Sequence, residues 1–196
     1  MTMKDAVKAC FSKYLTFSGR SSRSEFWKFI LFLLLVSIVL TIVNSVVFGP
    51  TVTHQIKISI DSAGQQTQSL NRHVEYNGGW LGFVFDIAVA LPLLAVAWRR
   101  MHDTGRRGIF VLLPVMGLSV AIAVIYLTSE KFPVDPSALP AEVTVPASIA
   151  VPGSPSLLIA AVLFAIATFV IVIVWLARGS QSGSNRYGPN PNEVRQ

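Results

Sequence analysis

The chain has 196 residues, of which 52% are hydrophobic and only 13% are charged, and its mean hydropathy is +0.57. This composition is more apolar and less charged than that of an average soluble domain and is typical of a membrane protein. The net charge is +6, but the positive residues lie where a membrane topology places them. We therefore exclude nucleic-acid binding as the explanation of this charge and expect no nucleic-acid partner.

The first predicted element is a short amphipathic helix over residues 5–16. Its apolar residues recur at helical spacing and are Val7, Cys10, Phe11, Tyr14 and Leu15. Two interpretations stay open: the helix lies flat in the inner membrane interface, or its apolar face packs on the end of the protein's own helices. Cys10 is the single cysteine, and we expect it to be a small interfacial hydrophobe rather than a reactive thiol.

A polar segment over residues 17–27 leads into the first apolar stretch. Ser22 and Glu25 have the spacing of a capping box, which starts a helix. Arg20 and Arg23 flank that helix N-terminus, whose dipole favours anions. A lipid phosphate is therefore a natural ligand of these two arginines.

Four stretches of about 19–23 residues are apolar enough to cross a bilayer, for which a helix needs about 20 residues. They cover residues 26–48, 80–98, 109–127 and 157–177. We predict an all-α membrane protein, a bundle of four transmembrane helices in one membrane domain (1–196), whose first span is an uncleaved anchor. Small residues in the third and fourth spans, such as Gly117 and Ala165, predict close helix packing.

The two longer connections between the spans are predicted to be exterior loops. In the first, 49–79, polar and apolar residues alternate up to Ile60, which indicates a strand and a β-hairpin that returns through residues 66–76. The second, 128–156, carries six prolines and is expected to be extended or polyproline-like rather than folded. Whether it covers the first loop or binds a partner stays open.

Asp86 is the only ionisable residue at a central position of the predicted spans, and Pro92 follows six residues later. An intramembrane carboxylate is by default a hypothesis of function, which here would be proton or ion coupling. The alternative is a structural carboxylate that is protonated or reached by water, because Asp86 lies near the exterior interface. Pro92 is expected to kink the helix.

The connection between the second and third spans holds the densest run of unusual residues, Arg-Arg-Met-His-Asp-Thr-Gly (99–105). His102 and Asp103 have side chains suited to general-base or metal chemistry, but a metal site needs three or four converging ligands. The other two histidines lie in the first exterior loop. We therefore expect no metal, no cofactor and no catalytic residue, with Asp103 pairing with arginines and capping the turn.

The tail after the fourth span contains Gly-Ser-Asn-Arg-Tyr-Gly-Pro-Asn-Pro (183–191), a sequence typical of turns. We expect it to fold back under the bundle through Tyr187 and Pro189, and the alternative is a solvated end. In the first case three polar segments form one basic cluster. The predicted members of this basic cluster are Arg20, Arg23, Arg99, Arg100, His102, Asp103, Asn185 and Arg186.

The positive charges alternate from one connection to the next. Of the 16 Lys and Arg residues, six lie in the N-terminal segment, four in the 99–108 connection and three in the tail. The exterior loops hold only Lys57, Arg72 and Lys131. Cytoplasmic segments retain positive charge during insertion, so we predict a multi-pass protein of the bacterial inner (plasma) membrane with a cytoplasmic N-terminus and C-terminus.

Three motifs follow one another along the chain. They are Phe-Ser-Gly-Arg-x-Ser-Arg-x-Glu-Phe-Trp (17–27), then Leu-Pro (91–92) followed by Arg-Arg-Met-His-Asp-Thr-Gly (99–105), then Gly-Ser-Asn-Arg-Tyr-Gly-Pro-Asn-Pro (183–191). In this order, and over nearly the whole chain, they resemble the bacterial inner-membrane family catalogued as domain of unknown function 805. The resemblance implies a small multi-span membrane protein without an established activity, and it transfers no catalytic residue.

The favoured function is a non-enzymatic membrane module that binds anionic lipid headgroups, or a partner protein, through the basic cluster. A second class is a small transporter or channel component that uses Asp86 and the Pro92 kink. A third is an enzyme acting on lipid phosphate. The expected partners are membrane lipids, above all anionic headgroups, with a membrane-protein partner or a second copy of the chain as further options.

Overall fold

The computed structural model describes residues 1–60, 66–133 and 148–193. Four helical segments of the described chain are long and apolar enough to cross a membrane. They are α2 (Arg23–Phe48), α3 (Gly79–Asp103), the 3-10 helix η1 (Gly108–Leu112) continued by α4 (Leu113–Thr128), and α5 (Pro155–Ala177). The helical membrane fold with four spans, predicted from hydropathy, is therefore confirmed.

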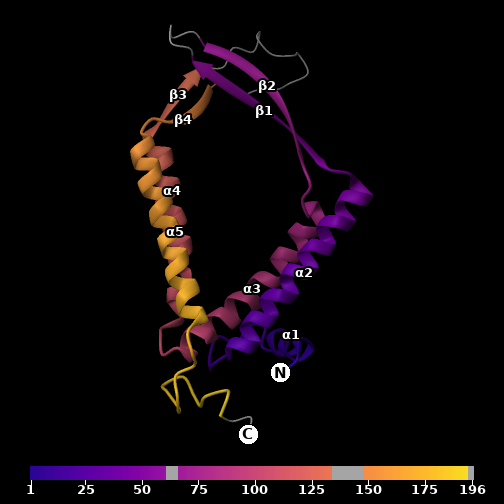
Figure 1. Cartoon of the computed structure of the whole chain (residues 1–196), viewed down its shortest axis with the longest axis vertical. Helices are drawn as coiled ribbons and strands as arrows, with labels where there is room; N and C mark the ends of the chain where they lie inside the picture. Colours follow the sequence, from indigo (N-terminus) through magenta and orange to yellow (C-terminus); the bar gives the residue numbers. More distant parts are fainter. Residues whose placement is uncertain (61–65, 134–147, 194–196) are drawn as a thin grey trace.

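The four spans form two pairs, α2 with α3 and α4 with α5. Figure 1 shows both pairs meeting at the end of the molecule where the two termini lie, which we call the terminal end. From there the pairs diverge toward the opposite end, which we call the hairpin end. Only 11–28% of the most apolar stretch of each helix is buried inside the chain, so most of this surface is left for lipid or another protein.

Small residues bring α4 and α5 together, as the sequence predicts. A Cβ atom on Gly117 would lie 2.3 Å from Thr168 Oγ1 and 3.2 Å from the Ala165 Cα, far inside normal contact distance. Ala121 and Ala161 are also buried. The close approach of this pair thus depends on small residues, above all on the missing side chain of Gly117.

The N-terminal helix α1 (Met3–Ser12) is shorter than the predicted 5–16 because its ends are set by local hydrogen bonds. Thr2 Oγ1 accepts from the Asp5 amide at 3.2 Å, while the Asp5 carboxylate accepts from the Thr2 amide at 2.8 Å. This capping box starts the helix two residues early. At the other end, Lys13 is the C-cap and donates its amide to the Ala9 carbonyl at 3.2 Å.

The apolar face of α1 is shared between protein and surroundings. Ala6 and Cys10 are fully buried where α1 packs on α2 and α3, and the Phe11 ring meets the edge of Phe29 at 5.7 Å. The exposed part of the same face consists of Met3 and Phe11, and Leu15, just after the helix, is also exposed. The helix therefore packs on the protein's own helices, which is the second interpretation left open by the sequence, and it still presents apolar side chains outward, so that its place in the membrane interface stays a prediction.

Helix α3 and the segment after it differ from the predicted spans at their ends. Residues 99–103, expected in a loop, form the buried last turn of α3. The next span begins as the 3-10 helix η1 because Pro114 has no amide to donate to an α-helical turn there. Gly108 opens η1 directly against the Trp98 indole, where a Cβ would lie 2.0 Å from Nε1. Pro92 is buried inside α3, which stays helical on both sides of it.

Two antiparallel strand pairs lie at the hairpin end (Figure 1). The hairpin predicted between the first two spans is confirmed, with β1 (Thr51–Ile60) paired to β2 (Gln66–Glu75). The second loop was expected not to fold, and this is wrong for its two ends, which pair as β3 (Ser129–Pro133) and β4 (Ser148–Pro152). The packing of α4 on α5 brings these ends together, and their prolines lie at the ends of the ladder, where a missing amide costs least. Residues 134–147 lie outside the described residues.

The hydrophobic core lies mainly at the terminal end, where α1, α2, α3 and α5 meet. It is built from aromatic side chains of α2 and small or flexible side chains of α3. Its buried members are Cys10, Phe26, Phe29, Leu33, Val89, Val96, Ala97, Met101, Val172 and Leu176. This core holds in place the polar residues that follow directly at the same end.

Candidate functional site

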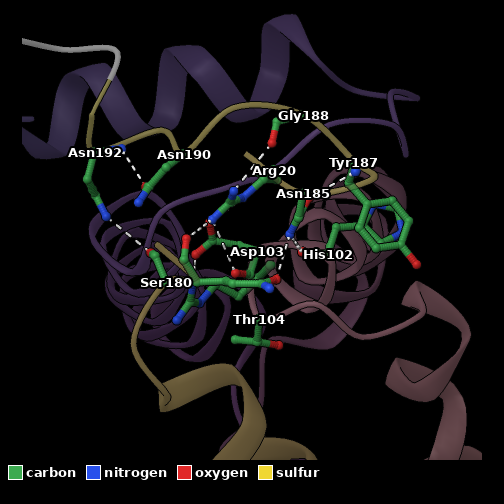
Figure 2. A network of polar contacts seen from close by, with 12 residues as sticks. Arg20, His102, Asp103, Thr104, Ser180, Asn185, Tyr187, Gly188, Asn190 and Asn192 are labelled. Atoms are coloured by element: carbon green, nitrogen blue, oxygen red, sulfur yellow. Dashed lines mark hydrogen bonds and ion pairs between the residues drawn. The ribbon is translucent and has the colours of Figure 1, made fainter. Parts of the chain in front are cut away.

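The three motif segments meet at the terminal end of the molecule. Figure 2 shows Arg20, from the segment before α2, lying between Asp103 at the end of α3 and the tail that carries Asn185 and Gly188. The tail thus folds back against the helices rather than extending away from them. Six of the eight residues predicted for the basic cluster form hydrogen bonds or ion pairs at this junction. The other two, Arg23 and Arg186, are exposed at its edge.

Arg20 uses all three of its guanidinium nitrogens inside the protein. Its Nε donates to Asp103 Oδ1 at 2.9 Å. Nη1 donates to the carbonyls of Gly183 at 2.8 Å and Gly188 at 3.3 Å, and Nη2 donates to the carbonyl of Gln181. Its side chain is only 1% exposed. This one arginine therefore fastens the tail to the end of α3.

Asp103 is fully buried and joins two arginines. Its Oδ1 accepts from Arg20, and its Oδ2 accepts from Nη1 of Arg100. Arg100 also donates from Nε to the Leu176 carbonyl at 2.9 Å and from Nη2 to the Arg178 carbonyl. These carbonyls belong to the C-terminal end of α5, where a cation complements both the free acceptors and the helix dipole. Asp103 pairs with arginines as the sequence indicated.

Arg99 pairs with Glu25 on the other side of α3. Nη1 of Arg99 donates to Glu25 Oε1 at 3.2 Å, and its Nε donates to the Ala95 carbonyl at 3.3 Å. Only one half of the predicted capping box is formed at the start of α2: Ser22 accepts from the Glu25 amide, while the Glu25 carboxylate pairs with Arg99. The Arg99 side chain is 1% exposed, and its Nη2 has no hydrogen-bond partner among the described residues.

Cys10 lies beside this ion pair. The pKa of its thiol is raised to about 12, chiefly by burial and then by the nearby Glu25 carboxylate, while Arg99 and Lys13 oppose the shift. The thiol is therefore protonated at neutral pH and packs as an apolar group. This agrees with the expectation of a small hydrophobe.

His102 contacts the tail through its ring. The ring stacks on Tyr187 with 3.7 Å between centroids and 3° between planes, and Nδ1 lies 3.1 Å from the Gly19 carbonyl, to which it donates when protonated. Asn185 donates from Nδ2 to the His102 carbonyl at 3.0 Å, and its Oδ1 accepts from the Tyr187 amide (Figure 2). His102 and Asp103 thus have different partners, and both serve to dock other segments.

The remaining two members of the basic cluster, Arg23 and Arg186, are exposed. Arg186 lies over the Tyr187 ring at 4.7 Å, and Arg23 is the first residue of α2. The structure therefore divides the arginines of the basic cluster into Arg20, Arg99 and Arg100, which are buried, and Arg23 and Arg186, which are exposed.

A pocket of about 330 Å³ opens beside the buried arginines. Its cations are Lys13, Arg20 and Arg99, its one acidic residue is Glu25, and its outer wall is formed by the tail through Tyr187 and other residues. We call this cavity the Arg99 pocket. Lys13 is not among the residues predicted for the basic cluster.

The tail carbonyls that bind Arg20 were also missed from the sequence. They belong to Gln181, Gly183 and Gly188, and a backbone acceptor leaves no signal in residue type. The sequence feature that indicates this binding is the glycine content of the tail. Gly183 and Gly188 both have positive φ angles, which let the tail turn around the guanidinium.

Asp86 lies away from these contacts. It is exposed on α3, two turns from the start of the helix, and lines a separate cavity of about 290 Å³ with Asn77 and Gly82. Among the residues that the structure describes, no three His, Cys, Asp or Glu side chains gather closely enough to hold a metal ion.

Comparison with known proteins agrees with these features. The chain is similar to "Inner membrane protein YhaI" of Escherichia coli, from strains K12 and O157:H7, with 29% identity over 100 residues in each case. The aligned region covers 51% of this chain and 62% of each relative. No solved structure matches. The family model described as "Protein of unknown function (DUF805)" matches residues 14–189, a range that includes all three motifs and all four spans, and the chain therefore belongs to this family of membrane proteins.

Proposed function

We propose that this protein is a non-enzymatic module of the bacterial inner membrane whose terminal end lies in the cytoplasm and binds anionic lipid headgroups. The name of its Escherichia coli relatives supports the inner-membrane location. Of the 15 Lys and Arg residues that the structure describes, 12 belong to the N-terminal segment, the 99–108 segment and the tail, which meet at the terminal end (Figure 1). This distribution supports a cytoplasmic orientation of that end.

The observation that carries the proposal is the exposed surface of α1. Its exposed apolar side chains stand next to exposed lysines, Lys4 and Lys8, and Lys13 follows at its end. Apolar side chains inserted at the acyl boundary and ammonium groups among the headgroups are the arrangement of an interfacial helix. The exposed arginines Arg23 and Arg186 add to the same basic surface.

Anionic lipid is favoured over a protein partner because these charges lie at the ends of spans, where headgroups are always present. A basic residue near an anionic leaflet contributes about 1 kcal/mol of attraction. Several such residues on one face are therefore enough to enrich anionic lipid around the terminal end. This contact needs no further folded partner.

The experiment compares melting temperatures in nanodiscs of zwitterionic lipid and of zwitterionic lipid mixed with phosphatidylglycerol. We expect the anionic mixture to stabilise the protein, and added salt to weaken the effect. The double variant Lys4→Gln, Arg23→Gln should respond less. The matched control is Arg72→Gln, Lys131→Gln, which removes two exposed charges at the hairpin end.

Equal stability in both lipids, or an equal loss of response in both double variants, would contradict binding at the terminal end. Native mass spectrometry of the protein released from native membranes provides an independent measurement. A bound protein in place of anionic lipid would favour the partner interpretation.

A further inference from the structure

We propose that the Arg99 pocket is a binding site for one phosphate group, presented by a lipid headgroup or as free phosphate, with Arg99 and Lys13 as its ligands. The inference rests on the proposed function and deepens it, because it assigns the anion to a defined cavity rather than to a charged surface.

The first support is the unused donor on Arg99. The guanidinium is buried, yet its Nη2 has no nitrogen or oxygen partner among the described residues, and the neighbouring Cys10 thiol, which interacts with Arg99, is only a weak acceptor. Leaving a buried charged donor unpaired is unfavourable, and nearly all such groups in folded proteins find a partner. A phosphate oxygen in the pocket would supply one, and guanidinium and phosphate groups match in geometry.

The second support is the charge that lines the cavity. Lys13, Arg20 and Arg99 face one carboxylate, that of Glu25, which is already paired with Nη1 of Arg99. Arg20 is neutralised by Asp103 outside the pocket. The positive charge of Lys13 therefore has no counterpart in the lining, and this favours an anion held between Lys13 and Arg99.

The size and position of the cavity fit the same ligand. Its volume of about 330 Å³ accommodates a phosphate group with several waters, since one water in the liquid occupies about 30 Å³. The pocket lies between the end of α1 and the start of α2, where the first predicted span begins. A headgroup phosphate would enter at this depth with its acyl chains remaining in the bilayer.

The test uses the full chain and separates the two phosphate sources. In zwitterionic nanodiscs, inorganic phosphate is compared with sodium chloride of equal ionic strength. In a second arm, nanodiscs containing phosphatidic acid are compared with nanodiscs of the zwitterionic lipid alone. The melting temperature is measured for the wild type, for Lys13→Gln and for the matched control Lys8→Gln, which removes an exposed lysine outside the pocket.

We expect phosphate or phosphatidic acid to raise the melting temperature of the wild type and of Lys8→Gln by several degrees, and that of Lys13→Gln by less than half as much. A response to inorganic phosphate assigns the site to the free anion, and a response confined to the lipid assigns it to a headgroup. The variant Arg99→Lys keeps the charge but loses the two-pronged donor geometry of the guanidinium, so it should also lose the stabilisation by phosphate.

The inference is overturned if neither probe stabilises the wild type, or if Lys13→Gln and Lys8→Gln respond equally. In the second case the salt-dependent preference for phosphatidylglycerol still stands, and only the pocket is rejected. If that preference is absent while inorganic phosphate acts through Lys13, the proposed lipid function fails and the phosphate site remains.

Discussion

Replacing Asp103 with asparagine is the most direct way to test whether the terminal end is held together by ion pairs. Asp103 is fully buried, and its two oxygens accept from Arg20 and Arg100. Through these arginines it joins the segment before α2, the end of α5 and the tail. Asparagine keeps nearly the same volume and one acceptor oxygen, so the change removes charge with little change of shape.

The expected cost follows from the contacts that are lost. Hydrogen bonds to charged groups contribute about 1.5–3 kcal/mol each, and Asp103 accepts two of them. Removing one partner from a buried ion pair typically costs about 3–5 kcal/mol, because it leaves an uncompensated charge. Here two buried guanidinium groups would face each other. Asparagine retains one acceptor, so we expect a loss of about 3–5 kcal/mol.

Unfolding by sodium dodecyl sulfate from mixed micelles, followed by tryptophan fluorescence, would measure this loss. The matched control is Asp86→Asn, the same chemical change at an exposed carboxylate on the same helix. We expect Asp86→Asn to preserve or raise stability, because an ionised carboxylate within a span is unfavourable. A loss below about 1 kcal/mol for Asp103→Asn, within the range of ordinary surface changes, would refute the assigned role of the pair.

Three further predictions concern topology, pH and packing. Reporters after Gln196 or near Arg106 should be cytoplasmic and reporters at Ala63 or Ala147 external, and an external C-terminus would rule out four spans from a cytoplasmic start. With the thiol pKa of Cys10 raised from 9.0 to about 12 by burial, maleimide at pH 8 should label Cys10 only after unfolding. The buried neutral thiol contributes its full stabilisation below the pKa of the unfolded state. This contribution to the free energy of unfolding declines as pH rises from 9 toward 12, and the Cys10→Ala variant should lack the decline. Gly117→Ala should destabilise the protein by about 1–3 kcal/mol through overpacking against Thr168, whereas Gly82→Ala, with open space around its Cβ, should not. Equal melting temperatures of the two glycine variants would contradict the close contact of α4 and α5.

Hydropathy was enough to locate the four spans, because a bilayer requires long apolar helices whatever their packing. Hydropathy did not predict where the spans end. The run from Arg99 to Asp103 was placed in a loop because charged residues normally end a span. The helix continues through these charges because Glu25 pairs with Arg99, Arg20 pairs with Asp103 and the end of α5 accepts from Arg100, and these partners are distant in sequence.

The candidate site was predictable in its members but not in their roles. Turn-forming residues in the tail correctly indicated that it folds back, and Asp103 was correctly paired with arginines. However, from the sequence alone every arginine counts as a cation that is available to a ligand. The acceptors of Arg20 are mostly backbone carbonyls, and these become visible only when Gly183 and Gly188 have turned the tail around the guanidinium.

This division of roles decides where binding must be tested. Arg20 and Arg100 donate from every guanidinium nitrogen to groups within the chain, so replacing either one measures the stability of the junction and not its affinity for an anion. Loss of lipid retention in such a variant would therefore be uninformative. Lys13 lies at the same junction, lines the pocket and is exposed, and its removal leaves every ion pair of the junction intact. A Lys13 variant that responds differently to anions would therefore report on binding alone. Arg99 has both a structural and a binding role, because its Nη1 donates to Glu25 whereas its Nη2 has no such partner.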